Sequence, residues 1–213
     1  MTTSDPVTLY YCPQTRASGT RVMLEELGAA YTLQVMDMHR GETRLPEFLA
    51  VNPLGKVPAI RHRGVVVTEQ IAIALYLGDQ FPQAGLAPAP QDPARGTYLR
   101  WMVYYAACFE PAVLDRANGH DPGEPSRSVY GDFDSMLRTF EAALIPGPYL
   151  LGDRISLADL QWATALQWTL QFGLVPEHPV LREYVTRVTD RESFRTVWAD
   201  DLRMVEQQQA ARG

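Results

Sequence analysis

Strand-like patterns occur only in the first 80 residues of the chain, and no convincing strand appears after Asp92. The β-branched and aromatic runs that predict strands are residues 7–11, 31–36, 58–63 and 64–67. Helical spacing covers residues 15–27, which Gly28 closes, and residues 69–77. The order β-α-β followed by β-β-α predicts a four-stranded mixed sheet with helices on both faces, because a right-handed β-α-β crossover makes its two strands parallel. The sequence therefore predicts an α/β domain followed by an all-α domain.

A proline-rich stretch separates the two parts. Four prolines, at positions 82, 88, 90 and 93, stand among Ala, Gly and Gln, which is typical of a linker. Helical patterns follow it at residues 94–118, 130–143, 157–172 and from 179 to the end. Ser156 and Asp159 form a capping box before the helix at 157, and Gly173 closes that helix. We predict a domain at 1–80, a linker at 81–93 and a helical domain at 94–213, a division that suits a length of 213 residues.

Composition excludes several classes of function. A net charge of −6 argues against nucleic acid or an anionic membrane as a partner, because both need a basic patch. Cys12 and Cys108 allow no disulfide framework and have no metal-ligand spacing, so we expect no metal. The first residues do not read as a signal peptide, and no apolar stretch is long enough to span a membrane. We therefore expect a cytoplasmic protein that binds a small molecule.

Two short segments carry a resemblance to a known family. Residues 52–60 read NPLGKVPAI, and residues 68–73 read TEQIAI. With the predicted sheet, the linker and the helical second part, they make the whole chain similar to the bacterial-type cytosolic glutathione transferases. The resemblance implies a thioredoxin-like first domain and a helical-bundle second domain. It also implies glutathione as co-substrate, a homodimer, and transfer of glutathione to a small electrophile, as in detoxification.

The first segment is expected to hold the peptide backbone of glutathione. Pro58 precedes a strand, where a proline has no amide hydrogen to lose. A cis bond between Val57 and Pro58 would turn the main chain of Val57 outward, so that an extended peptide docks against it. The family binds the cysteinyl unit of glutathione in this way, and we expect a cis bond here.

The second segment is expected to hold the γ-glutamyl end of glutathione. Glu69 and Gln70 stand in the first turn of a helix, which we expect Thr68 to cap, and free amides there favour a carboxylate. The Glu69 carboxylate suits the ammonium group, and Gln70 replaces the serine usual in the family. The glycyl carboxylate needs a cation, for which the candidates are Lys56, His39, Arg40 and Arg16.

Activation of the glutathione thiol requires a hydrogen-bond donor rather than a base. A free thiol has a pKa near ~8.5, and lowering it by ~2 takes ~2.7 kcal/mol. One hydroxyl and a helix N-terminus supply this amount. The candidates are Tyr11, Thr15 and Ser18. Serine- and cysteine-type relatives carry the group just after the first strand, which favours Thr15 or Ser18, whereas tyrosine-type relatives match Tyr11. We favour Thr15.

Two alternative functions remain open, and the place of the second substrate is also expected from the sequence. Cys12-Pro13 is similar to the start of glutaredoxins, so a glutathione-dependent thiol-disulfide reductase that uses Cys12 is one alternative. A non-catalytic interaction module of the same fold is the other. The electrophile is expected between the domains, beside aromatic residues of the first C-terminal helix, namely Tyr104, Tyr105 and Phe109.

Overall fold

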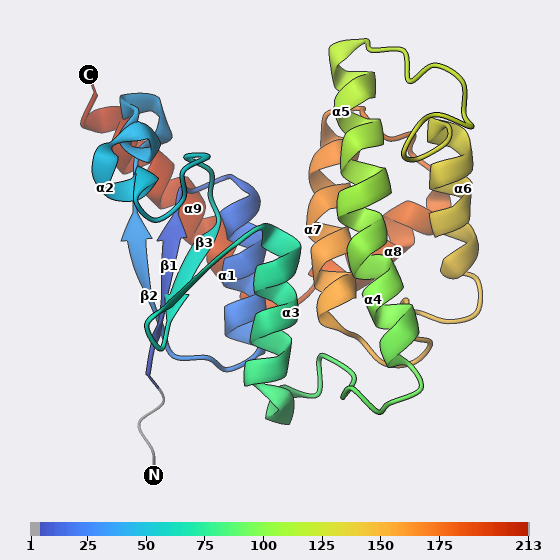
Figure 1. Cartoon of the computed structure of the whole chain (residues 1–213), viewed down its shortest axis with the longest axis horizontal. Coiled ribbons are helices and arrows are strands. Elements are labelled where there is room, and N and C mark those ends of the chain that lie inside the picture. The colour runs from blue at the N-terminus through green and yellow to red at the C-terminus, as the bar shows by residue number, and fades with distance from the viewer. Residues whose placement is uncertain (1–4, 213) are drawn as a thin grey trace. The chain divides into compact units, whose positions relative to one another are not determined.

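The computed structural model describes residues 5–212, which form two compact units. The first contains the chain up to Ala84 and again from Arg191 onward, and the second runs from Gly85 to Asp190. Figure 1 shows the strands in the first unit and the bundle of helices in the second. Within the described residues, none of the helices has both the length and the apolar character that a membrane span needs.

The first unit contains a four-stranded sheet in the order β2-β1-β3-β4. β1 is parallel to β2 and antiparallel to β3, and β3 is antiparallel to β4. The mixed thioredoxin-like sheet predicted from the sequence is therefore confirmed. Arg63 and Gly64 both have positive φ angles, 49° and 77°, as the tight turn between β3 and β4 requires. The strands are β1 (Val7–Tyr11), β2 (Tyr31–Val35), β3 (Ala59–His62) and β4 (Val65–Thr68).

Helices α1 and α3 of the first unit pack against each other (Figure 1). α1 is almost wholly buried from Ala17 to Leu24, since the sheet and other helices enclose it. α3 continues three residues beyond the predicted end, through Gly78, and ends before its C-cap Phe81, which Pro82 follows. The helical segments are α1 (Arg16–Glu26), η1 (Met38–Arg40), η2 (Glu42–Arg44), α2 (Pro46–Leu49), α3 (Gln70–Gln80) and η3 (Pro82–Ala84).

The last helix of the chain, α9 (Glu192–Ala210), packs with the sheet unit and not with the helical unit. Ion pairs join it and the residue before it to α1: Arg21 to Asp200 at 2.5 Å and Glu26 to Arg191 at 2.6 Å. The compact units thus differ from the predicted division, which placed the whole segment 94–213 in the helical domain. Contacts across some 165–179 residues of sequence have no local pattern that would predict them.

The second unit is a helical bundle around an aromatic core. The indole of Trp162 stacks on Phe140 at a centroid distance of 3.9 Å, and Trp101 lies edge-on to Trp162. The predicted helix 94–118 is interrupted by a π-helical turn, because Pro111 has no N–H for the normal ladder. The helices are α4 (Arg95–Tyr104), η4 (Tyr105–Phe109), α5 (Glu110–Asn118), α6 (Phe133–Ala143), α7 (Leu157–Gln171) and α8 (Pro179–Thr189).

Candidate functional site

The predicted glutathione segments meet at one end of the sheet. Tyr10 of β1 lies opposite Ala59 of β3, and Ala59 lies opposite Thr68 of β4. Continuing this register by one residue places Pro58 between the end of β1 on one side and Glu69 on the other. The loop after β1, the loop before β3 and the start of α3 are therefore neighbours.

The peptide bond between Val57 and Pro58 is cis, which confirms the prediction. The pairing of β3 with both neighbours begins at Ala59, so Val57 lies outside the strand ladder. Val57 is half-buried and Lys56 is exposed. The main chain before β3 thus lies at the sheet end without being part of the sheet.

The loop before Val57 has a fixed conformation. The buried Asn52 side chain donates to the carbonyl of Lys56 at 2.8 Å and accepts from the amide of Leu54 at 3.1 Å. Gly55 has a φ angle of +60°, and a Cβ there would lie 2.6 Å from the Thr43 carbonyl oxygen. Only glycine fits at this approach of two backbones. The NPLGKVP motif therefore includes residues whose role is to hold its shape.

The N-terminus of α3 has no side-chain cap. Glu69, with a φ angle of +67°, is the N-cap residue and makes no capping hydrogen bond. The expectation that Thr68 caps α3 was wrong, because Thr68 remains paired in β4. Gln70 donates from Nε2 to the carbonyl of Arg16 at 3.3 Å, which ties α3 to the start of α1. Uncapped amides of α3 and the Glu69 carboxylate are thus available at this end of the sheet.

Thr15 is the N-cap of α1 and is half-buried. Its hydroxyl accepts from the Ala17 amide at 3.2 Å and donates to the Cys12 carbonyl at 2.7 Å. Thr15 therefore lies at the N-terminus of α1, as the sequence predicted. Donation to a bound sulfur requires that its hydrogen leave the Cys12 carbonyl.

The hydroxyls of Tyr11 and Ser18 are both buried and both donate to Asp201 of α9. The Ser18 bond measures 2.6 Å, and the other oxygen of the carboxylate accepts from Tyr11. Burial raises the pKa of Tyr11 above its usual value, and the neighbouring Asp201 charge raises it further. Of the three candidate hydroxyls, only that of Thr15 makes no hydrogen bond to this carboxylate. Asp201 itself was absent from the residues predicted by sequence.

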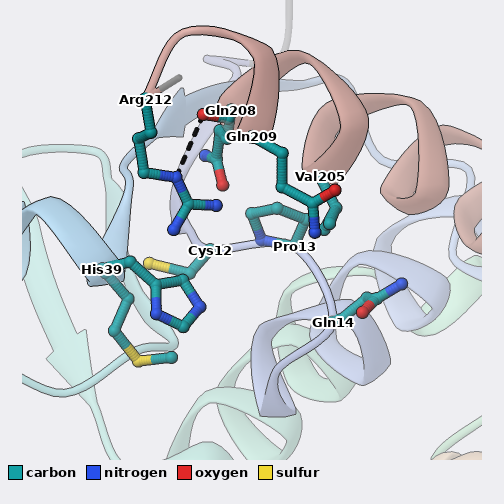
Figure 2. Close-up of a pocket in the computed structure, with 9 residues that line it drawn as sticks. Cys12, Pro13, Gln14, His39, Val205, Gln208, Gln209 and Arg212 are labelled. Carbon is teal, nitrogen blue, oxygen red and sulfur yellow. Dashed lines mark hydrogen bonds between the residues drawn. The ribbon is translucent and has the colours of Figure 1, made fainter.

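A pocket of about 200 Å³ lies beside the loop after β1 (Figure 2). The loop, η1 and the last turns of α9 enclose it, and His39 is the one predicted cation that lines it within the described residues. Arg212 lies at its rim and donates to the Gln208 carbonyl. The lining residues are Cys12, Pro13, Gln14, Met38, His39, Val205, Gln208, Gln209 and Arg212.

Cys12 is almost completely buried although it lines this pocket. Its side chain packs with Met36, Phe48 and Ala59. Burial raises the pKa of Cys12 to about 12, and the nearby charges of Asp37 and Glu42 contribute. Its thiol is therefore protonated at neutral pH and is a poor nucleophile.

The aromatic residues proposed for the electrophile lie in the second unit. Tyr104 donates to the Met136 carbonyl at 3.1 Å. Tyr105 and Phe109 are buried and pack against Trp162, with centroid distances of 5.7 and 4.9 Å. These contacts belong to the core of the helical unit, and a role in substrate binding stays a prediction. Among the described residues, no group of His, Cys, Asp or Glu is arranged to hold a metal ion.

Comparison with known families identifies both parts of the chain. Residues 5–79 match the glutathione S-transferase N-terminal domain, and residues 111–187 match the glutathione S-transferase C-terminal domain. Glutathione S-transferase 1 of Dianthus caryophyllus is 38% identical over 191 residues, which are 82% of this chain and 83% of that protein. The disulfide-bond oxidoreductase YfcG of Escherichia coli is 24% identical over 87% of this chain and 91% of its own length.

Solved structures give the same result. A glutathione transferase from Methylococcus capsulatus has a TM-score of 0.78 and 28% identity, and the match covers 92% of this chain and 98% of the other. A glutathione transferase homologue from Sulfitobacter, solved with bound glutathione, has a TM-score of 0.74 and 25% identity, with the same coverage. The similarity extends through both units.

Proposed function

The chain belongs to the cytosolic glutathione S-transferase family, and from this premise we propose that it binds glutathione and presents the thiolate to a small electrophile. The observation that carries the proposal is the convergence, at one end of the sheet, of the Val57-Pro58 main chain, the uncapped start of α3 and Thr15. These features supply partners for the cysteinyl unit, the γ-glutamyl end and the sulfur, respectively.

The γ-glutamyl end has partners of both signs. The amides of the first turn of α3 suit its carboxylate, and Glu69 suits its ammonium group. Gln70 uses one amide hydrogen on Arg16, so its other hydrogen is left for the ligand. Exposed Lys56 and His39 are the proposed partners of the glycyl carboxylate, and Arg16, the first residue of α1, is a further candidate.

Thr15 and the N-terminus of α1 are proposed to stabilise the thiolate. A hydrogen bond to a charged acceptor contributes about 1.5–3 kcal/mol, and a helix dipole up to about 1 kcal/mol. Together they are enough to lower a thiol pKa by about 2. The chemistry then consists of attack by the sulfur anion on the electrophile, with no covalent intermediate on the protein.

Glutathione should raise the melting temperature of the protein, because a ligand that binds only the folded state stabilises it. At a concentration 100 times Kd the gain is about 2.7 kcal/mol, which corresponds to roughly 5–10 °C for a chain of this size. Cysteinylglycine, which lacks the γ-glutamyl group, should give a much smaller shift in a thermal-shift titration. No shift with glutathione at millimolar concentration would favour a non-catalytic interaction module.

Cys12→Ser should leave both the absorbance of bound glutathione thiolate and the conjugation rate within about twofold of wild type. The reason is that burial holds the Cys12 thiol protonated, so it neither attacks a disulfide nor replaces the thiolate of glutathione. The measurement is a conjugation assay beside a glutathione-disulfide exchange assay. Loss of disulfide exchange in Cys12→Ser, with thiolate absorbance unchanged, would support the reductase function instead.

The remaining parts of the function stay predictions drawn from the family. They are a small electrophile as the second substrate, bound beside Tyr104, Tyr105 and Phe109, and the homodimer. A cytoplasmic location and the absence of a metal requirement belong with them.

A further inference from the structure

Asp201 joins the last helix of the chain to the loop that carries Thr15. It is buried, with 2% of its surface exposed, and three donors from the N-terminal segment surround its carboxylate. Two are the hydroxyls of Tyr11 and Ser18, and the third is the backbone amide of Gln14, at 2.9 Å from Oδ2. The first two bonds satisfy side chains, whereas the third fixes the main chain one residue before Thr15.

Gln14 has a backbone conformation that needs support. Its φ angle is +55°, in the left-handed region that non-glycine residues seldom adopt. It stands between Pro13, which lines the pocket, and Thr15, which begins α1. Figure 2 draws this loop together with Val205, Gln208 and Gln209 from the following turns of α9. The hydrogen bond to Asp201 offsets the cost of this conformation and determines the direction in which the chain enters α1.

We propose that Asp201 is a positioning residue for the glutathione thiolate: through the Gln14 amide it sets the orientation of Thr15 and of the first amides of α1. The inference rests on the proposed function and adds to it a contribution from the C-terminal end of the chain. Asp201 thereby contributes to the reaction from α9.

The charge of Asp201 and its hydrogen bond with the Gln14 amide have opposite effects on the pKa of the glutathione thiol. A nearby negative charge disfavours a thiolate, so charge alone would make the thiol less acidic. Arg21 faces the same region, with its guanidinium carbon 5.9 Å from the centre of the Tyr11 ring, and pairs with Asp200. The two roles of Asp201 therefore predict changes of opposite sign when the side chain is replaced.

The test is ultraviolet titration of the thiolate of bound glutathione in the full-length protein. We expect Asp201→Ala, which removes the acceptor of the Gln14 amide, to raise the pKa of the thiol by about one and to lower the thiolate fraction at pH 7 about threefold, since the pKa starts at ~6.5. Asp201→Asn keeps an oxygen for that amide and loses the charge, so the pKa should stay within about 0.3 of wild type or fall. Asp200→Asn is the matched control on the neighbouring residue, and it should lower the melting temperature without changing the pKa.

Two results would overturn the inference. An unchanged pKa in Asp201→Ala would reduce Asp201 to a structural residue, and a lower pKa in both Asp201 variants would make its charge the dominant effect. If Asp201→Ala does not fold, the thiol pKa is compared between two other proteins: the double variant Tyr11→Phe/Ser18→Ala, and the triple variant that also carries Asp201→Ala. Both hydroxyls that donate to Asp201 are already absent from the double variant, so the added substitution leaves no buried hydroxyl without its acceptor. If the wild-type protein does not bind glutathione, both the proposed function and the inference are overturned. If it binds glutathione but the thiol pKa does not change in Asp201→Ala, only the inference is overturned.

Discussion

We expect Thr15→Ala to raise the pKa of the bound glutathione thiol by about one to two, because a charge-assisted hydrogen bond of about 1.5–3 kcal/mol is lost. At pH 7 the value of kcat/KM should fall about 3- to 25-fold, in proportion to the thiolate fraction, as the thiol pKa rises from ~6.5 to about 7.5–8.5. At a pH well above the raised pKa, the thiol ionises without help and most of the rate should return. The measurements are the thiolate absorbance and the pH profile of conjugation.

The control for this variant must separate activation from helix capping. The Thr15 hydroxyl accepts from the Ala17 amide, so its removal also costs about 1 kcal/mol of stability as a lost N-cap. Thr15→Ser keeps both functions and should behave as wild type. If Tyr11→Phe moves the pKa and Thr15→Ala does not, the protein is of the tyrosine type and the assignment of Thr15 is wrong.

Most of the fold was predictable because its elements have local signals. The strand runs, the turn at Arg63-Gly64 and the capping box of Ser156 with Asp159 are all present as the sequence indicated. Helix bounds differ by a few residues, since α3 continues past Gly78 and α6 begins after its N-cap Asp132 and not at residue 130. The π-helical turn before Pro111 was missed, since a helical pattern does not show how a missing N–H will be accommodated.

The candidate site was predictable only where it consists of contiguous motifs. Residues 52–58 and 69–70 lie together at the sheet end because strand register brings them there. Asp201 was missed because its partners are more than 180 residues away in the sequence. One signal was present: Phe194, Val197 and Asp201 follow the spacing of one buried helix face, and a carboxylate in an apolar stripe indicates a buried partner.

We expect the largest loss of stability from Asp159→Ala in the helical unit. The side chain is fully buried, and its carboxylate accepts from the amides of Leu150 and Ser156, both at 2.8 Å, from the Ser156 hydroxyl and from Tyr184 at 3.0 Å. Alanine leaves these donors buried without an acceptor, and each unpaired buried group costs about 1–3 kcal/mol. Removal of the carboxylate also removes the cost of burying its charge, which offsets part of this loss. The free energy of unfolding should therefore fall by about 3–5 kcal/mol, and the melting temperature by roughly 10 °C.

Ser156→Ala is the matched control, because it removes one hydroxyl from the same capping box and leaves the backbone amide of Ser156 bonded to Asp159. It should cost about 1 kcal/mol, as a lost cap does. Urea unfolding followed by tryptophan fluorescence is a suitable measurement, since Trp101 and Trp162 are both buried in this unit. The difference between the variants isolates the buried carboxylate from the cap. If Asp159→Ala is no more destabilising than Ser156→Ala, the donors around Asp159 find other acceptors and the carboxylate does not organise this part of the bundle.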